Sequence, residues 1–314
     1  MLILRLFSEL LPLLALGYLI GRFKAELASQ IAPPLINFGI PVSLMGLLLK
    51  SGMDWRLFEA LAMSFLAIGL LIVVIRTFPK IRTIIGNRSL LLGSVFGNSG
   101  HLGIPVSLAL LPSQALSFSI GYDLASTLLV WSLGPILFAN SSSELKGRAA
   151  WTNLLGVLTS SPATKGLVGA FFVQLTPWND QITSALWIPS RIVIVLALMI
   201  VGIRLGSFGS VNNQGIRNLF SIVGPSLLIK LIFLPVLMLA LAKVFGLSTL
   251  MSNALVLQAA TPTAISVLLL AEASGKEQHV AASLVAWSTL ISLATIPICS
   301  VSYTHLRAHE TSLH

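Results

Sequence analysis

Long apolar runs dominate the chain, and short polar stretches separate them. A helix of about 20 apolar residues can cross a bilayer, and runs such as 227–242 are apolar on every helical face. The pattern predicts an all-α integral membrane protein in which the first span is not a cleaved leader, because many spans follow it. Ten spans are predicted: 2–20, 31–49, 57–75, 89–111, 116–139, 164–178, 184–205, 219–243, 248–272 and 279–300.

Composition strengthens this assignment and excludes several other classes. The chain is 55% hydrophobic and 9% charged, whereas soluble domains carry roughly a quarter charged residues. The net charge of +9 does not indicate nucleic-acid binding, because the basic residues lie mostly between apolar runs. A single cysteine, Cys299, excludes an intrachain disulfide framework, and the five histidines have no metal-ligand spacing. We therefore expect no cofactor and no metal.

The basic residues predict how the chain is oriented. With the N-terminus outside, inside loops hold twelve Lys and Arg residues and outside loops hold five. This bias predicts a multi-pass protein of the inner (plasma) membrane with both termini extracytoplasmic. The inside set is Arg22, Lys24, Arg76, Lys80, Arg82, Arg88, Lys146, Arg148, Lys165, Arg204, Arg217 and Lys276, and the outside set is Arg5, Lys50, Arg56, Lys243 and Arg307.

Two of the predicted spans are interrupted. The fourth reads FGNSGHLGIP at 96–105, and the ninth reads QAATPTA at 258–264, where Pro262 removes a backbone donor. The longest polar connection, 140–163, separates the fifth span from the sixth. Interrupted helices at matching places in two halves are typical of transporter binding sites. We expect five-span repeats over 1–139 and 164–301, inverted because the number is odd, with spans four and nine crossing at the midplane.

The interruptions also predict where a ligand binds. Breaking a helix frees N–H groups at the start of its second half, where the partial positive charge favours anions. Polar side chains there add neutral donors, glycines allow close backbone approach, and prolines keep the helices from resealing. The predicted substrate-binding residues are Asn98, Ser99, Gly100, His101, Gly103, Pro105, Thr261, Pro262 and Thr263.

Three charged residues within the spans, Asp123, Lys230 and Arg191, are further candidates for a role in function. A carboxylate inside a membrane is costly and marks a functional hypothesis, so Asp123 is interpreted as a proton carrier, a partner of Lys230 or a hydrated interfacial group. For Lys230 the alternatives are coupling to a transported ion, a structural pairing with another group, or extension of its ammonium to the membrane interface. Arg191 contacts the substrate or anchors the chain near the outer end of its span. His101 either senses pH or faces a neighbouring helix or lipid headgroups.

The interrupted segments carry a family resemblance. FGNSGHLGIP resembles the N-x-G-x-x-G-I-P crossover of the auxin efflux carrier family, LQAATPTAISVLLLAE (257–272) is similar to its second crossover, and 33–49 to its proline-containing second span. The resemblance covers 1–300 and implies inverted repeats, scaffold and transport subdomains, export of weak organic acids and a homodimer. By this resemblance, the crossover asparagine of the family corresponds to Asn98, and its crossover prolines correspond to Pro105 and Pro262. The long central loop of the plant carriers is absent, which favours a dicarboxylate or similar small acid over auxin.

The favoured function is an efflux permease for small organic acid anions that works by alternating access. A sodium-coupled symporter of the bile-acid type remains an alternative, and a coupling proton or sodium ion is a possible partner besides substrate and membrane lipid. An intramembrane enzyme is disfavoured, since no G-x-S-x-G, aspartate pair or zinc set occurs. No pore motif indicates a channel.

Two segments fall outside this scheme. Residues 148–158 of the linker form either a short interfacial helix or an ordinary loop. The tail 302–314 has three histidines and no apolar periodicity. It resembles translated read-through at a truncated gene end, so we expect it to be non-native.

Overall fold

The first half of the chain folds into helices in the predicted order. The computed structural model describes residues 2–24, 26–52, 55–138, 156, 159, 162–208 and 213–310. The interfacial helix considered for 148–158 lies outside these residues, apart from Gly156. The elements are α1 (Leu2–Phe23), α2 (Glu26–Pro34), the π-turn η1 (Leu35–Gly39), α3 (Ile40–Ser51), α4 (Trp55–Thr77), α5 (Pro79–Ile84), α6 (Arg88–Val95), η2 (Ser99–Gly103), α7 (Ile104–Leu110), the 3₁₀ turn η3 (Ser113–Ala115) and α8 (Leu116–Phe138).

The second half contains similar kinds of element in a different order. A short helix comes first, then one long helix, a helix interrupted by a π-turn, a broken helix and a final long helix. These are α10 (Pro162–Gln174), α11 (Asn179–Phe208), α12 (Asn213–Leu228), η4 (Ile229–Phe233), α13 (Leu234–Val244), α14 (Thr249–Ala259), α15 (Ile265–Ser274) and α16 (Gln278–Glu310). Ten spans in two inverted repeats remain a prediction.

Six helical segments of the described residues are long and apolar enough to cross a membrane: Glu26–Lys50, Trp55–Thr77, Leu116–Phe138, Asn179–Ser207, Phe220–Val244 and Gln278–Ile296. Shorter apolar helices cover Leu11–Phe23, Ser99–Leu110 and Ile265–Ser274. Ser99–Leu110 and Ile265–Ser274 are the second halves of the two broken helices. Each is too short to cross a membrane alone, because the break divides its span. The chain is a multi-pass membrane protein.

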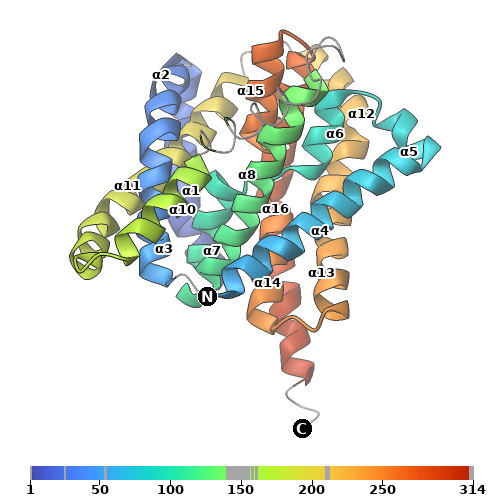
Figure 1. The fold of residues 1–314 in the computed structure, drawn as a ribbon. Coiled ribbons are helices and arrows are strands. Elements are labelled where there is room, and N and C mark those ends of the chain that lie inside the picture. The colour runs from blue at the N-terminus through green and yellow to red at the C-terminus, as the bar shows by residue number, and fades with distance from the viewer. Residues whose placement is uncertain are drawn as a thin grey trace.

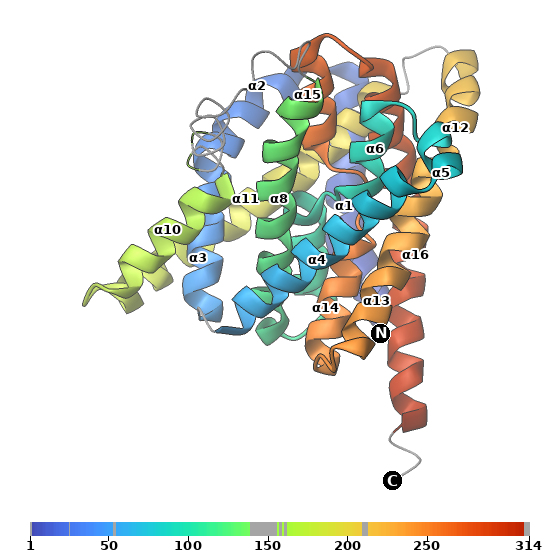
Figure 2. The same cartoon turned by 45° about the vertical axis from the view of Figure 1, so that its right-hand side comes forward.

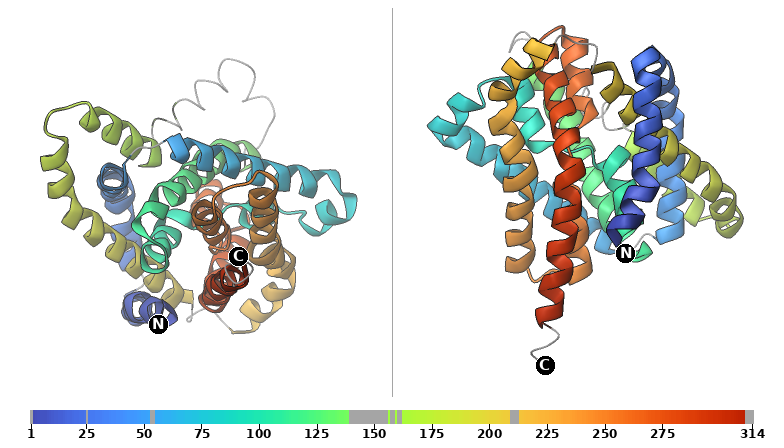
Figure 3. Two further views of the ribbon diagram at one scale, coloured as in Figure 1. Left: turned by 90° about the horizontal axis from the view of Figure 1, so that it is seen from below. Right: turned by 180° about the vertical axis from the view of Figure 1, so that it is seen from behind.

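The helices form two groups. One group contains α1, α2, α3, α10 and α11, which lie together on the left of Figure 1. The other contains α4, α6, α12, α13 and α16, and the view from behind in Figure 3 separates α16 and its neighbours from α1. The broken helices and α8 pack between these outer layers, so the predicted binding segments occupy the interior (Figure 2).

Three π-turns share a local cause. In each, a proline stands two residues beyond the turn: Pro41 after η1, Pro105 after η2 and Pro235 after η4. A proline has no N–H to donate and its ring crowds the carbonyl four residues before it. The turn widens in response. The N–H of the residue just before the proline then bonds to the carbonyl five residues earlier, as the Ile104 N–H bonds to the Ser99 carbonyl.

The last helix does not stop where the composition changes. Helix α16 continues through the predicted tail as far as Glu310, and residues 311–314 lie outside the described part. Both chain ends lie toward the same end of the bundle in Figure 1. That residues 302–314 are non-native remains a prediction.

Candidate functional site: a crossing of two broken helices

The two interrupted helices meet at their breaks. The Asn98 N–H donates to the Pro262 carbonyl at 2.7 Å, and the Ala264 N–H donates to the Phe96 carbonyl at 3.0 Å. Gly97 and Thr263 thereby form an isolated antiparallel bridge. Each break thus satisfies part of the backbone of the other, as buried N–H and C=O groups require inside a membrane.

Side chains bind the carbonyls that the breaks leave free. Lys230 is fully buried in η4, and its Nζ donates to the Ala259 carbonyl at the end of α14 at 2.6 Å. A cation at a helix C-terminus interacts favourably with the partial negative charge there. Thr263 Oγ1 donates to the Gly93 carbonyl at 3.0 Å, and Thr261 Oγ1 donates to the Gln258 carbonyl at 2.6 Å.

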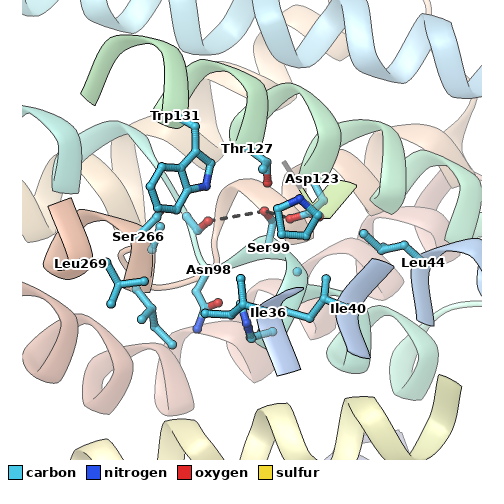
Figure 4. Close-up of a pocket in the computed structure, with 16 residues that line it drawn as sticks. Ile36, Ile40, Leu44, Asn98, Ser99, Asp123, Thr127, Trp131, Ser266 and Leu269 are labelled. Carbon is cyan, nitrogen blue, oxygen red and sulfur yellow. Dashed lines mark hydrogen bonds between the residues drawn. The ribbon is translucent and has the colours of Figure 1, made fainter. Parts of the chain in front are cut away.

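A cavity of about 90 Å³ opens on one side of the crossing. This volume holds a few water molecules or the carboxylate of a small acid. Its polar end contains Asn98, Ser99 and Asp123, and most of the remaining wall is apolar (Figure 4). The full lining is Ile36, Ile40, Leu44, Gly97, Asn98, Ser99, Gly100, His101, Asp123, Thr127, Trp131, Pro162, Ala264, Ile265, Ser266 and Leu269.

Both second half-helices begin at this cavity. The first three N–H groups of η2 and the first two of α15 have no carbonyl a turn earlier to bond, because the chain there is not helical. They belong to Ser99, Gly100, His101, Ile265 and Ser266, all of which line the cavity. The partial positive charge of two helix N-termini is therefore directed at one small space.

Asn98 provides an unpartnered side chain at the same place. It is 4% exposed and lines the cavity, and no hydrogen bond to its amide occurs within the described part of the chain. Its amide faces the cavity, so a ligand in the cavity can bond to it without breaking a hydrogen bond within the protein.

Asp123 is the acidic group of the cavity. Its Oδ1 accepts a hydrogen bond from Ser99 Oγ at 2.7 Å, and the residue is 6% exposed. A Cβ added to Gly100 would lie 3.0 Å from the same oxygen, so the carboxyl group packs directly against the backbone of η2. The pairing of Asp123 with Lys230 considered from the sequence is wrong, since Lys230 bonds to Ala259 instead.

The predicted binding residues divide into two sets. Asn98, Ser99, Gly100 and His101 line the cavity together with Asp123. The others hold the crossing or shape the helices and do not line this cavity: Gly103, Pro105, Thr261, Pro262 and Thr263. Gly103 permits a close contact that the sequence did not indicate, because a Cβ there would clash with Gln258 Oε1.

Arg191 lies away from the cavity. Its guanidinium carbon stacks over the Trp187 ring at 4.9 Å from the centroid, and Lys50 Nζ lies over the same ring at 5.8 Å. The Arg191 side chain is exposed. This cation–π cluster fits the anchoring alternative rather than substrate contact.

Sequence reasoning missed three polar residues near the crossing. Thr127 and Trp131 follow Asp123 by one and two helical turns, so helical spacing from Asp123 would have found them. Gln258 is fully buried with neither side-chain amide atom hydrogen-bonded. It stands in the quoted 258–264 segment, yet nothing local distinguishes it from an exposed glutamine.

No group of three or more His, Cys, Asp or Glu side chains that could hold a metal ion occurs within the described ranges. The second half of the chain, residues 152–300, matches a family described as membrane transport protein. This match confirms the predicted resemblance to the auxin efflux carrier family over those residues.

One curated relative supports the same assignment. It is an uncharacterized transporter of Methanothermobacter thermautotrophicus, 26% identical over 215 residues. The aligned part covers 65% of this chain and 64% of the relative, which is less than two thirds of the relative's length.

Proposed function

From the match of residues 152–300 to a membrane transport family, we propose that the chain is a secondary transporter that exports small organic acid anions. The anion binds at the crossing, with its carboxylate against the Asn98 amide and the free N–H groups of η2 and α15. The observation that carries this proposal is the unpartnered Asn98 amide in a cavity formed at two helix N-termini.

The lining of the cavity favours a particular class of acid. Apart from the polar end, its wall is formed by side chains such as Ile36, Ile40 and Trp131, and none of the described residues that line it is Lys or Arg. A second carboxylate would therefore lack a cationic partner and would be costly to bury. We infer a substrate with one carboxylate and an apolar remainder, rather than the dicarboxylate that the sequence favoured.

The position of the cavity supports alternating access. It lies between the two helix groups, with Ile36, Ile40 and Pro162 on one side and the crossing and α8 on the other. A second cavity of about 30 Å³ follows the same interface and shares Ile40, Leu44, Gly100 and His101 with the first. Relative movement of the groups would open one cavity while closing the other.

The cavity lies on the side where α8 ends and α10 begins, because Thr127, Trp131 and Pro162 line it. The positive-inside bias assigns that side to the cytoplasm. In the proposed orientation this conformation takes substrate from inside the cell, as an exporter requires.

Replacement of Asn98 tests the proposal. A hydrogen bond to a charged group contributes about 1.5–3 kcal/mol, so Asn98→Ala should weaken binding of labelled benzoate to purified protein by roughly tenfold to a hundredfold. Asn98→Asp should weaken it further, because a second carboxylate would repel the anion. Asn253→Ala, on α14 outside the cavity, is the matched control and should bind as wild type does.

Proteoliposome flux separates the proposed function from its alternative. Benzoate and acetate should exchange across the membrane without sodium, and succinate should exchange poorly. Flux that requires a sodium gradient would favour the bile-acid-type symporter. Equal benzoate affinity in wild type and both Asn98 variants would remove the crossing as the binding site.

A further inference from the structure

Asp123 occupies a place that an anionic substrate would need. Its carboxyl lies against Gly100 and accepts the Ser99 hydroxyl, at the first turn of the half-helix whose N–H groups would bind the substrate. Asp123 and the unpartnered Asn98 amide line the same cavity of about 90 Å³ (Figure 4). Two carboxylates in a space of this size lie within a few ångströms of each other.

Two negative charges at that separation repel each other strongly, because water is scarce in a buried site and the effective dielectric constant is low. No Lys or Arg among the described lining residues offsets them. Lys230 reaches the crossing from behind Gly97, but its Nζ is bonded to the Ala259 carbonyl and it is fully buried. The substrate anion and an ionised Asp123 therefore exclude each other.

We propose that the substrate anion binds together with one proton, and that Asp123 holds this proton. The inference rests on the proposed function, since it assigns a coupling ion to the same site. A protonated Asp123 removes one of the two charges and gives the cavity an additional O–H donor. The loaded site then contains a monocarboxylate and a neutral aspartic acid.

The transport cycle balances in charge and atoms. On the loading side, Asp123 takes a proton from water and the anion binds. On the opposite side, the anion leaves and the Asp123 proton returns to water. One monoanion and one proton cross together, so each turnover moves no net charge. Net flux then follows the combined gradients of the anion and the proton, and a membrane potential alone does not drive it. Net export requires an outward gradient of the anion that exceeds the inward proton gradient.

Other titratable groups are less well placed to serve as the proton site. Within the described part of the chain, His101 is the only other titratable residue in the cavity lining. Tyr122, next to Asp123 on α8, is fully buried with its hydroxyl unbonded. The remaining charged residues on helices packed against α8 do not line the cavity: Lys50 on α3, Arg56, Glu59 and Arg76 on α4, Arg88 on α6, Lys165 on α10 and Glu272 on α15.

Proton uptake on binding tests the proposal directly. Purified wild-type protein in weakly buffered detergent solution is mixed with benzoate, and a pH-indicator dye reports the protons taken up. About one proton should disappear per bound anion wherever free Asp123 is ionised, and benzoate affinity should fall about tenfold per pH unit there. Asp123→Asn should bind benzoate with a pH-independent affinity and without proton uptake.

Glu59→Gln is the matched control, because it neutralises an exposed carboxylate on α4, a helix that packs against α8, and Glu59 does not line the cavity. It should retain proton uptake and the pH dependence of benzoate affinity. In proteoliposomes, Asp123→Asn should exchange benzoate for benzoate but should no longer accumulate it in response to a proton gradient.

The possible outcomes are separable. Wild-type protein that binds benzoate without taking up protons at any pH overturns the proton site while leaving the transporter proposal intact. Proton uptake that persists in Asp123→Asn, or disappears in Glu59→Gln, also overturns it. Absence of binding by wild type at every pH contradicts the proposed function instead. The wild-type stoichiometry is informative even if the Asp123 variant does not fold.

Discussion

At the residue scale, neighbouring positions of one motif have different tasks. Gly100 lies against the Asp123 carboxyl in the cavity, whereas Gly103, one turn later, lies against the buried Gln258 amide. Both glycines allow close approach, one toward the candidate ligand site and the other toward the partner helix. A residue's place in the motif therefore does not reveal whether its loss changes binding or stability.

Substitution of Gly103 should test this division. In Gly103→Ala, the new Cβ would meet Gln258 Oε1 and the Thr261 methyl group in a packed interior. Overpacking of this kind costs about 1–3 kcal/mol, so the midpoint of thermal unfolding in detergent should fall. Gly69→Ala on α4 is the control, because no atom lies within 4 Å of its added Cβ. A Gly103 variant as stable as the Gly69 variant would contradict the close contact.

At the element scale, side chains from distant segments bind the ends of the broken helices. Lys230 of η4 bonds to the last carbonyl of α14, and Ser288 Oγ of α16 accepts the Thr263 N–H. The start of α6 depends on Glu277, whose Oε2 accepts the Ser89 N–H at 2.7 Å, while the side chain of the N-cap residue Asn87 makes no capping bond. These bonds connect the broken helices to helices packed beside them.

The Glu277 bond connects the start of α6 to the connection between α15 and α16. Loss of a helix N-cap acceptor costs about 0.5–2 kcal/mol, so Glu277→Ala should lower the thermal unfolding midpoint. Glu277→Gln retains an oxygen acceptor and should recover most of the loss. If Ala and Gln variants unfold at the same temperature as wild type, the bond contributes nothing to the stability of this end.

At the scale of the whole molecule, the two helix groups and the orientation of the bundle decide what the cavity faces. The α13–α14 connection lies toward the same end as both chain termini, and α5 lies toward the opposite end (Figure 1). The α5 segment carries Lys80 and Arg82, and the charge bias predicts that it faces the cytoplasm. We propose that the cavity faces the same side, because Trp131 of α8 and Pro162 of α10 line it.

Labelling of two matched threonines should test the orientation. Thr83 on α5 and Thr249 at the start of α14 are both exposed. In a Cys299→Ser background, an impermeant maleimide added to intact cells should label Thr249→Cys and should leave Thr83→Cys unlabelled until the membrane is opened. The reverse pattern would invert the protein in the membrane and turn the cavity outward.

Much of the fold was predictable because its signals are local. Hydropathy predicted helices throughout, and glycine and proline at 96–105 and 258–264 predicted both breaks, since backbone conformation depends on adjacent residues. The first polar residues after a break, such as Asn98 and Ser99, follow directly, because a half-helix always begins with free N–H groups. The π-turns have an equally local cause in Pro41, Pro105 and Pro235.

What the tertiary structure decided involves contacts between segments far apart in sequence. The bridge between Gly97 and Thr263 forms only in the folded chain. The fold also determines that Lys230 bonds to the Ala259 carbonyl and not to Asp123. Packing of α8 against η2 brings Asp123 to Ser99, and packing of the two helix groups adds Ile36, Ile40 and Pro162 to the same cavity. A lysine or aspartate in an apolar run must find some partner, because an unpaired buried charge is costly. Which partner it finds depends on how the helices cross, and no local pattern in the sequence specifies that.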